Sequence, residues 1–185
     1  MISIQKDGRV DVALGDATLA ANDVFPMIWF DGKPAPERLK TSGAWTERTP
    51  VEDALGQGQG IRHQFKGCQW SVRTYPTRPF FAVQVGYTNE SKKPIQVKAL
   101  FPWCVGEPGR GSLTLGPGTP EILTGITSGT PTLTQGQAQS DDAIALFNPA
   151  NGRSLIAGFI TADHARNRIE AGSSAPSEKN KSAAF

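Results

Sequence analysis

The chain has 185 residues, of which 38% are hydrophobic and 19% charged, and its formal net charge is +2. This composition indicates one soluble globular domain with its own core and excludes a disordered chain. No run approaches the roughly 18 apolar residues of a membrane-spanning helix, and no basic cluster with interleaved aromatic residues favours nucleic-acid binding. The 20 glycines and 14 prolines recur between short apolar runs, which is typical of all-β domains.

Alternating segments predict short strands through the first thirty residues. Residues 9–14 and 18–21 predict two of them. The run VFPMIWF at 24–30 predicts a third strand, which the turn signal Asp31-Gly32 ends. Pro26 lies inside this run, and its missing amide hydrogen indicates a sheet edge or a bulge.

The next segment, 33–60, is rich in proline, glycine and polar residues and predicts a long loop crossed by one short strand near 44–46. Its last part, Gly56-Gln57-Gly58-Gln59-Gly60, resembles a phosphate-binding loop only in its glycine content. It lacks the Lys-Ser/Thr ending and the following helix of such loops, so no phosphate site is predicted there.

Hairpins are predicted in the middle of the chain. Residues 61–65 and 69–75 flank a Lys-Gly turn and predict the first. The second covers 80–102 (FFAVQVGYTNESKKPIQVKALFP), where apolar residues alternate with polar ones on both sides of the polar link 89–94. Two such runs predict an antiparallel pair of strands with one buried face.

Further short strands follow without a helical period. They are predicted at 112–115, 122–123, 131–134, 143–147, 154–161 and 167–170. The sequence therefore predicts an all-β fold, a two-sheet antiparallel β-sandwich of the supersandwich type, over residues 1–171. Residues 172–185 are expected to be a polar linker or a truncated end.

Candidate catalytic groups have no supporting pattern. The acidic pairs Glu52-Asp53 and Asp141-Asp142 lie in polar segments, where solvation explains them. Asp163 and His164 are neighbours near a strand end, with Arg166 close by, but adjacent strand residues point to opposite faces. No catalytic residue, metal site or cofactor is predicted, because ligand spacing and nucleophile motifs are lacking.

The tryptophans suggest carbohydrate contact. Trp45 lies in a polar segment beside Glu47 and Arg48, and these three residues are the candidate sugar contacts. Loop anchoring and packing against a partner domain are the other interpretations of Trp45. The three remaining tryptophans sit in apolar runs and are predicted core residues: Trp29, Trp70 and Trp103.

The two cysteines, Cys68 and Cys104, are interpreted as thiols or as a single bridge. The first twelve residues carry four charges and lack the apolar core of a secretory signal, so the cellular compartment stays open.

Three phrases resemble segments of a known family. Thr88–Val97 (TNESKKPIQV) closes one strand and opens the next, and Ser154–Thr161 (SLIAGFIT) precedes Arg166–Gly172 (RNRIEAG). With these phrases, residues 80–172 resemble the N-terminal β-supersandwich domain of family 36-type α-galactosidases and raffinose-synthase-like glycosidases. The resemblance implies an accessory domain that packs on a (β/α)8 barrel in the same parent chain and helps to shape its substrate entrance. The catalytic carboxylates of that family lie in the barrel, so none transfers to this chain.

The predicted function is therefore that of a non-catalytic N-terminal accessory domain, or a fragment, of an α-galactosidase-like glycoside hydrolase, with carbohydrate and the barrel as partners. A free-standing carbohydrate-binding module and a structural or adhesion sandwich are the alternatives. An independent sugar epimerase or lyase ranks last, because the two histidines lie far apart in the sequence.

Overall fold

A computed structural model gives the fold. It describes residues 2–4, 10–14, 19–39, 45–65, 67–76, 78, 80–105, 111–124, 132–134, 137–141, 143–159, 168–173 and 183–184. The chain divides into two compact units, one of residues 1–15 and 22–104 and the other of residues 16–21 and 105–185. The two are described separately below.

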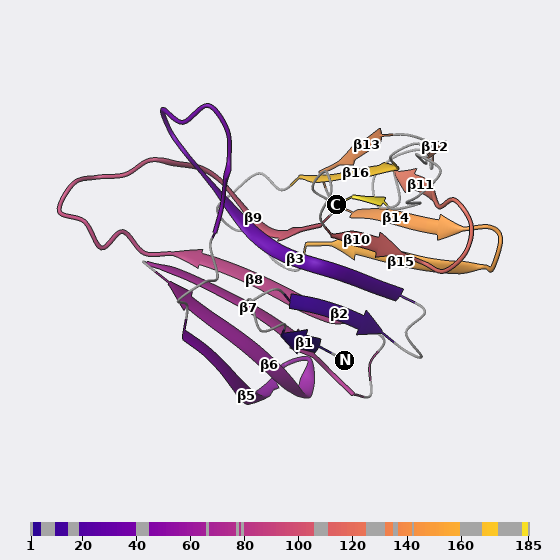
Figure 1. Cartoon of the computed structure of the whole chain (residues 1–185), viewed down its shortest axis with the longest axis horizontal. Coiled ribbons are helices and arrows are strands. Elements are labelled where there is room, and N and C mark those ends of the chain that lie inside the picture. Colours follow the sequence, from indigo (N-terminus) through magenta and orange to yellow (C-terminus); the bar gives the residue numbers. More distant parts are fainter. Residues whose placement is uncertain are drawn as a thin grey trace. The chain divides into compact units, whose positions relative to one another are not determined.

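The first unit contains a four-stranded antiparallel sheet (Figure 1). Its strands are, in order, β5 (Trp45–Asp53), β6 (Gly56–Phe65), β7 (Cys68–Thr74) and β8 (Phe81–Tyr87). The predicted hairpin around Lys66-Gly67 is confirmed as β6 and β7. The predicted long loop over 33–60 is wrong, because β5 and β6 occupy its second half and pair along their full lengths. Glycines that signal a loop in isolation are here strand residues.

A second group of strands belongs to the same unit, except that residues 19–21 fall in the second unit. It comprises β1 (Ile2–Ile4), β2 (Val10–Leu14), β3 (Leu19–Phe30), β4 (Glu37–Arg38) and β9 (Val97–Cys104). Strands β1, β2 and β3 are neighbours in order, and both β4 and β9 pair antiparallel with β3. The bulge expected at Pro26 is confirmed, since the register between β3 and β9 shifts between Phe25 and Met27.

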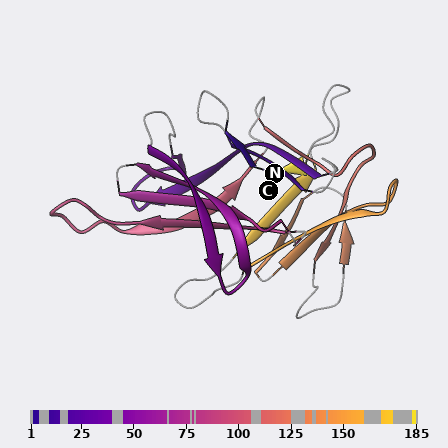
Figure 2. The ribbon, with the colours of Figure 1, turned by 90° about the horizontal axis from the view of Figure 1, so that it is seen from below.

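The hairpin predicted over 80–102 is wrong in its pairing, although both strands exist. Strand β8 pairs with β7, whereas β9 pairs with β3 in the other group of strands. The segment between them, residues 88–96, is an exposed loop that connects one layer to the other (Figures 1 and 2). A sequence pattern gives the faces of a strand but not its partner, which is why two well-patterned neighbouring runs predict a pair that does not form.

Apolar side chains from both groups form the core of the first unit. Phe25, Ile28, Trp70 and Val72 are at most 2% exposed. The indole nitrogen Nε1 of Trp70 in β7 donates a hydrogen bond to the carbonyl of Pro102 in β9, at 2.8 Å. This bond satisfies the polar atom of a fully buried tryptophan and connects the four-stranded sheet to the other layer.

The second unit contains two further sets of antiparallel strands. One has the order β12 (Thr132–Thr134), β11 (Glu121–Thr124), β14 (Ala143–Asn148) and β15 (Arg153–Gly158). The other has the order β10 (Ser112–Thr114), β17 (Ala183–Ala184), β16 (Ile169–Ser173) and β13 (Gln137–Ser140). Strand β17 and the last two residues of β16 fall within the segment 172–185. Leu113, Ile122, Ile144 and Leu146 are buried in this unit.

The predicted fold class, an all-β antiparallel sandwich, is confirmed. The described residues form strands, turns and bends, and none of them is helical. Within that part of the chain, no helix is therefore long and apolar enough to cross a membrane.

Candidate functional site

The predicted sugar contacts all lie on strand β5. The backbone of Trp45 begins the strand opposite Gln64, and its side chain lies outside the described residues. Glu47 is half-buried and Arg48 is exposed. Because they are neighbours in a regular strand, their side chains project to opposite faces of the sheet. Glu47 and Arg48 therefore do not face one common ligand.

Beside these residues lies a polar network that the sequence pattern does not reveal. One oxygen of Asp53, Oδ2, accepts hydrogen bonds from the Tyr75 hydroxyl at 2.8 Å and from Arg73 Nη1 at 3.1 Å. The other oxygen, Oδ1, accepts the backbone amide of Leu55 at 2.9 Å. The second terminal nitrogen of Arg73 donates to the side-chain oxygen of Gln84. The network thus joins the end of β5 with β7 and β8.

Two glycines of β6 allow this network to form, because β6 lies between β5 and β7. A Cβ atom at Gly58 would lie 2.4 Å from the carbonyl oxygen of Thr74 and 3.0 Å from a ring carbon of Tyr75. A Cβ at Gly60 would lie 2.9 Å from a methyl of Val51 and 3.7 Å from the Arg73 side chain. The missing side chains leave room for Arg73 and Tyr75 to reach across β6 to Asp53. This close approach explains the glycine repeat that resembles a loop in the sequence.

Hydrogen bonding sets the charge of this network. The hydrogen bond from Tyr75, followed by those from Leu55 and Arg73, holds the pKa of Asp53 below its ordinary value. Burial, and then the bond to Asp53, raises the pKa of Tyr75 above its ordinary value. The carboxylate is therefore an anion and the phenol is neutral at physiological pH. An Asp in this state can accept hydrogen bonds, but it is a poor general acid.

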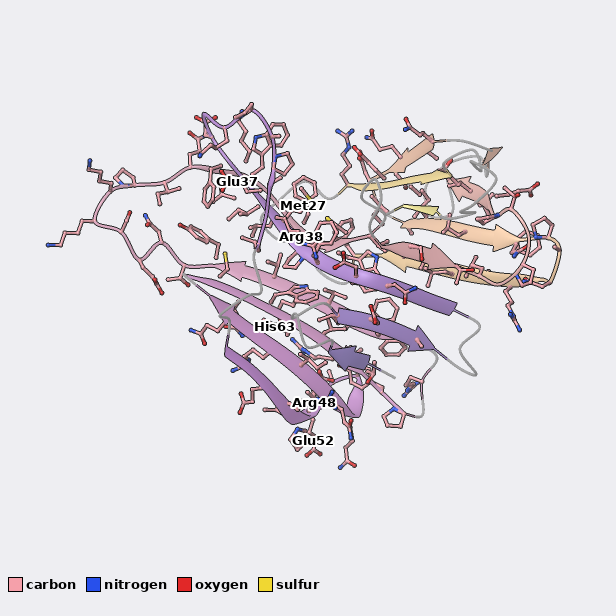
Figure 3. The ribbon with its side chains drawn as sticks, viewed as in Figure 1. Met27, Glu37, Arg38, Arg48, Glu52 and His63 are labelled. Atoms are coloured by element: carbon pink, nitrogen blue, oxygen red, sulfur yellow. The ribbon has the colours of Figure 1, made fainter. Side chains whose placement is uncertain are left out.

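His63 is the described histidine, and it is a core residue of the first unit. It is 1% exposed, and its ring stacks on Trp70 with centroids 5.4 Å apart. Burial lowers its pKa, so the ring is neutral near pH 7. Figure 3 labels His63 on β6, and Arg48 and Glu52 on the neighbouring strand β5.

A buried ion pair fixes the strands of the other layer. Asp23 is 2% exposed, and it adopts a positive φ of 55° within β3. Its Oδ1 lies 2.6 Å from Arg38 Nη2, and its amide donates to Asp11 Oδ1 at 2.9 Å. The guanidinium of Arg38 also lies 3.9 Å from the centre of the Phe25 ring. These contacts attach β4 to β3 beside Met27, as Figure 3 shows.

The predicted core tryptophans differ in exposure. Trp70 is fully buried, as predicted, but Trp29 and Trp103 are half-buried. Trp29 donates its indole hydrogen to the carbonyl of Lys33 at 3.0 Å. The ammonium of Lys98 lies 5.1 Å from the centre of its ring and 3.4 Å from Asp31 Oδ1. One face of the Trp29 ring is thus already covered by a cation.

Strands β3, β8 and β9 carry two contacting pairs of half-buried aromatic rings. Phe30 and Tyr87 make an edge-to-face contact with centroids 5.4 Å apart. Phe81 and Trp103 are tilted against each other at 4.7 Å. All four rings keep part of their surface in solvent. We call these four residues the aromatic edge.

The remaining candidates form no second cluster within the part of the chain that the structure describes. Glu52 is exposed at the edge of the sheet and Asp141 is exposed after β13. Cys68 and Cys104 are not joined by a disulfide, and burial raises the pKa of Cys68. Among the described residues, no group of three or more His, Cys, Asp or Glu could hold a metal ion. The candidates that lie outside the described residues are Asp142, Asp163, His164 and Arg166.

Comparisons with known proteins add no relative: no family model, curated protein or solved structure matches the chain.

Proposed function

We propose that the chain is a non-catalytic accessory module of a carbohydrate-active glycoside hydrolase of the α-galactosidase type. Its role is to pack against a (β/α)8 catalytic barrel, which supplies both carboxylates for hydrolysis of a terminal α-linked sugar. The resemblance of residues 80–172 to the N-terminal domains of such enzymes supports this proposal. The all-β architecture agrees with the fold that the resemblance implies.

The aromatic edge is the observation that carries the proposal. Phe30 with Tyr87, and Phe81 with Trp103, form two pairs of large rings that keep part of their surface in solvent. Burying aromatic surface is the main source of affinity in protein interfaces, and such rings are enriched at their centres. A module that docks on another domain needs accessible aromatic rings of this kind.

The state of the carboxylates supports a non-catalytic role. Retaining and inverting glycosidases need one carboxylic acid with a raised pKa as the proton donor. Asp53 has the opposite environment, since three donors hold its pKa down. Asp23 is committed to the ion pair with Arg38.

The test expresses the chain and the barrel of an α-galactosidase of this type as separate polypeptides. We expect a stable complex that hydrolyses aryl α-galactosides, and no hydrolysis by the chain alone. Phe81→Ala should weaken the complex, whereas Phe147→Ala, at an exposed phenylalanine of the second unit, should leave it unchanged. Hydrolysis by the chain alone would overturn the proposal, and so would a failure of the two polypeptides to associate.

A further inference from the structure

Strand register places a line of polar residues across the four-stranded sheet of the first unit. Glu47 is opposite Arg62, Arg62 is opposite Ser71, and Ser71 is opposite Gln84. Residues directly opposite one another in antiparallel strands project to the same face. One residue from each of β5, β6, β7 and β8 therefore contributes to a single line, which we call the polar row.

The polar row lies on the face of the sheet that points away from the core. On the two central strands, the residues beside Arg62 and Ser71 are buried and project to the opposite face: Ile61, His63, Trp70 and Val72. Arg62 and Gln84 are exposed, and Glu47 and Ser71 are half-buried. Gln64 and Gln69, a pair in the next line, are exposed as well. The outer face is thus built from amide, guanidinium and carboxylate groups.

Part of this surface is ordered before any ligand arrives. Arg73 lies beside the polar row, and its two terminal nitrogens donate to Asp53 and to Gln84. The bond to Asp53 is also an ion pair of 3.1 Å. Gly58 and Gly60 have no side chains on the part of β6 between β5 and β7, so the Arg73 side chain can cross β6 there. Side chains fixed in this way lose less conformational entropy on binding than free ones.

Charge and length define the ligand class. The face carries two carboxylates, Glu47 and Asp53, and two guanidinium groups, Arg62 and Arg73, so its formal charges cancel. A balanced set of planar donors and acceptors suits the adjacent hydroxyls of a neutral ligand, because each planar group can bond two hydroxyls at once. With a strand spacing of about 4.8 Å, the four residues of the row extend over roughly 14 Å. That length fits a short oligosaccharide better than a single sugar.

We propose that the polar row, together with Arg73, binds a neutral oligosaccharide, with Glu47, Arg62 and Gln84 as its hydrogen-bonding residues. The choice of carbohydrate rests on the proposed function, and the site is a contact surface separate from any catalytic centre. Of the sugar contacts expected from the sequence, Glu47 belongs to this site and Arg48 does not. The backbone of Trp45 stands two residues before Glu47 on the same strand.

The test titrates the chain with raffinose and with short galacto-, manno- and malto-oligosaccharides, followed by isothermal calorimetry and amide NMR shifts. One of these probes should bind, and Arg62→Ala and Gln84→Ala should each weaken it roughly tenfold, because each removes a bond to the ligand. Arg48→Ala is the matched control, since Arg48 is also exposed but projects from the opposite face of the sheet. Circular dichroism should show an unchanged fold in all three variants.

Three results of this titration would contradict the proposed site. Binding that survives Arg62→Ala and Gln84→Ala, or that Arg48→Ala abolishes, would overturn this assignment of the site. A lack of binding by every probe would overturn it as well. Complex formation with the barrel does not depend on this face, so the accessory role and the oligosaccharide site can fail independently.

Discussion

At the scale of single residues, the glycine repeat of β6 makes a direct prediction. Gly58→Ala should destabilise the first unit by about 1–3 kcal/mol, because the added methyl overlaps a backbone carbonyl oxygen at 2.4 Å. The strand can relieve this overlap only by moving Thr74 and Tyr75 away from Asp53. Urea unfolding followed by tryptophan fluorescence measures the effect, since all four tryptophans lie in this unit.

Gly86→Ala in β8 is the control for that substitution. A Cβ atom at Gly86 would have no other atom within 4 Å, and the φ of this residue is not positive. The free energy of unfolding of this variant should therefore stay close to that of the natural chain, or rise slightly through loss of unfolded-state entropy. Equal destabilisation by both substitutions would contradict a specific role for Gly58.

Residue patterns in the sequence identify only part of the candidate site. The sequence places Glu47 and Arg48 together as sugar contacts in a polar segment. This grouping ignores strand alternation, because the composition of the segment predicts a loop. Arg62, Ser71 and Gln84 lie 15 to 37 positions after Glu47 in the sequence. Only the register brings them into one row, and register depends on pairing that no local pattern encodes.

At the scale of elements, the turn between β14 and β15 holds a neighbouring loop of the second unit. Asn148 is fully buried, its Nδ2 donates to the carbonyl of Pro117 at 2.8 Å, and its Oδ1 accepts the amide of Ala150 at 3.1 Å. Asn148→Asp replaces the donor by a buried anion that faces a carbonyl oxygen. It should cost about 3 kcal/mol and should increase amide hydrogen exchange in residues 115–118.

Gln139→Glu makes the same change of charge at an exposed position of the same unit, in β13. Its stability and exchange rates should match those of the natural chain. Thermal unfolding by circular dichroism and hydrogen exchange by mass spectrometry are the measurements, because the second unit has no tryptophan. If exchange at 115–118 does not change in Asn148→Asp, the side chain does not hold this loop.

Elements with a strong local signal are predicted well from the sequence. The turn at 148–152 contains proline and glycine between the two predicted strands 143–147 and 154–161, and β14 and β15 pair across it. Strands β8 and β9 carry an equally clear alternation, yet they belong to different layers. The two cases differ in the connection between the strands. A tight turn makes the two strands pair, whereas the nine-residue loop 88–96 does not.

At the scale of the whole molecule, the groups with shifted pKa values predict a stability maximum near neutral pH. Burial lowers the pKa of His63, so the unfolded chain binds a proton that the folded chain resists. The contribution of His63 to stability is complete above the pKa of the unfolded chain, about 6.5, and is lost as the pH falls toward the lower pKa of the folded chain. The pKa of Asp53 is also lowered, which extends the loss into the range below about pH 4.

At alkaline pH, stability depends on groups whose pKa values are raised in the folded chain. Burial raises the pKa of Cys68 and of Tyr75, so their contributions are complete below the unfolded values of about 8.5 and 10 and are lost above them. All four groups lie in the first unit. Urea unfolding monitored by tryptophan fluorescence should therefore show a plateau between about pH 6.5 and 8.5, with declines on both sides. In His63→Gln the decline between about pH 6.5 and 5 should flatten, because glutamine does not titrate, while the alkaline decline should persist. If the acid decline of that variant matches the natural chain, another group of the molecule sets the acid limit.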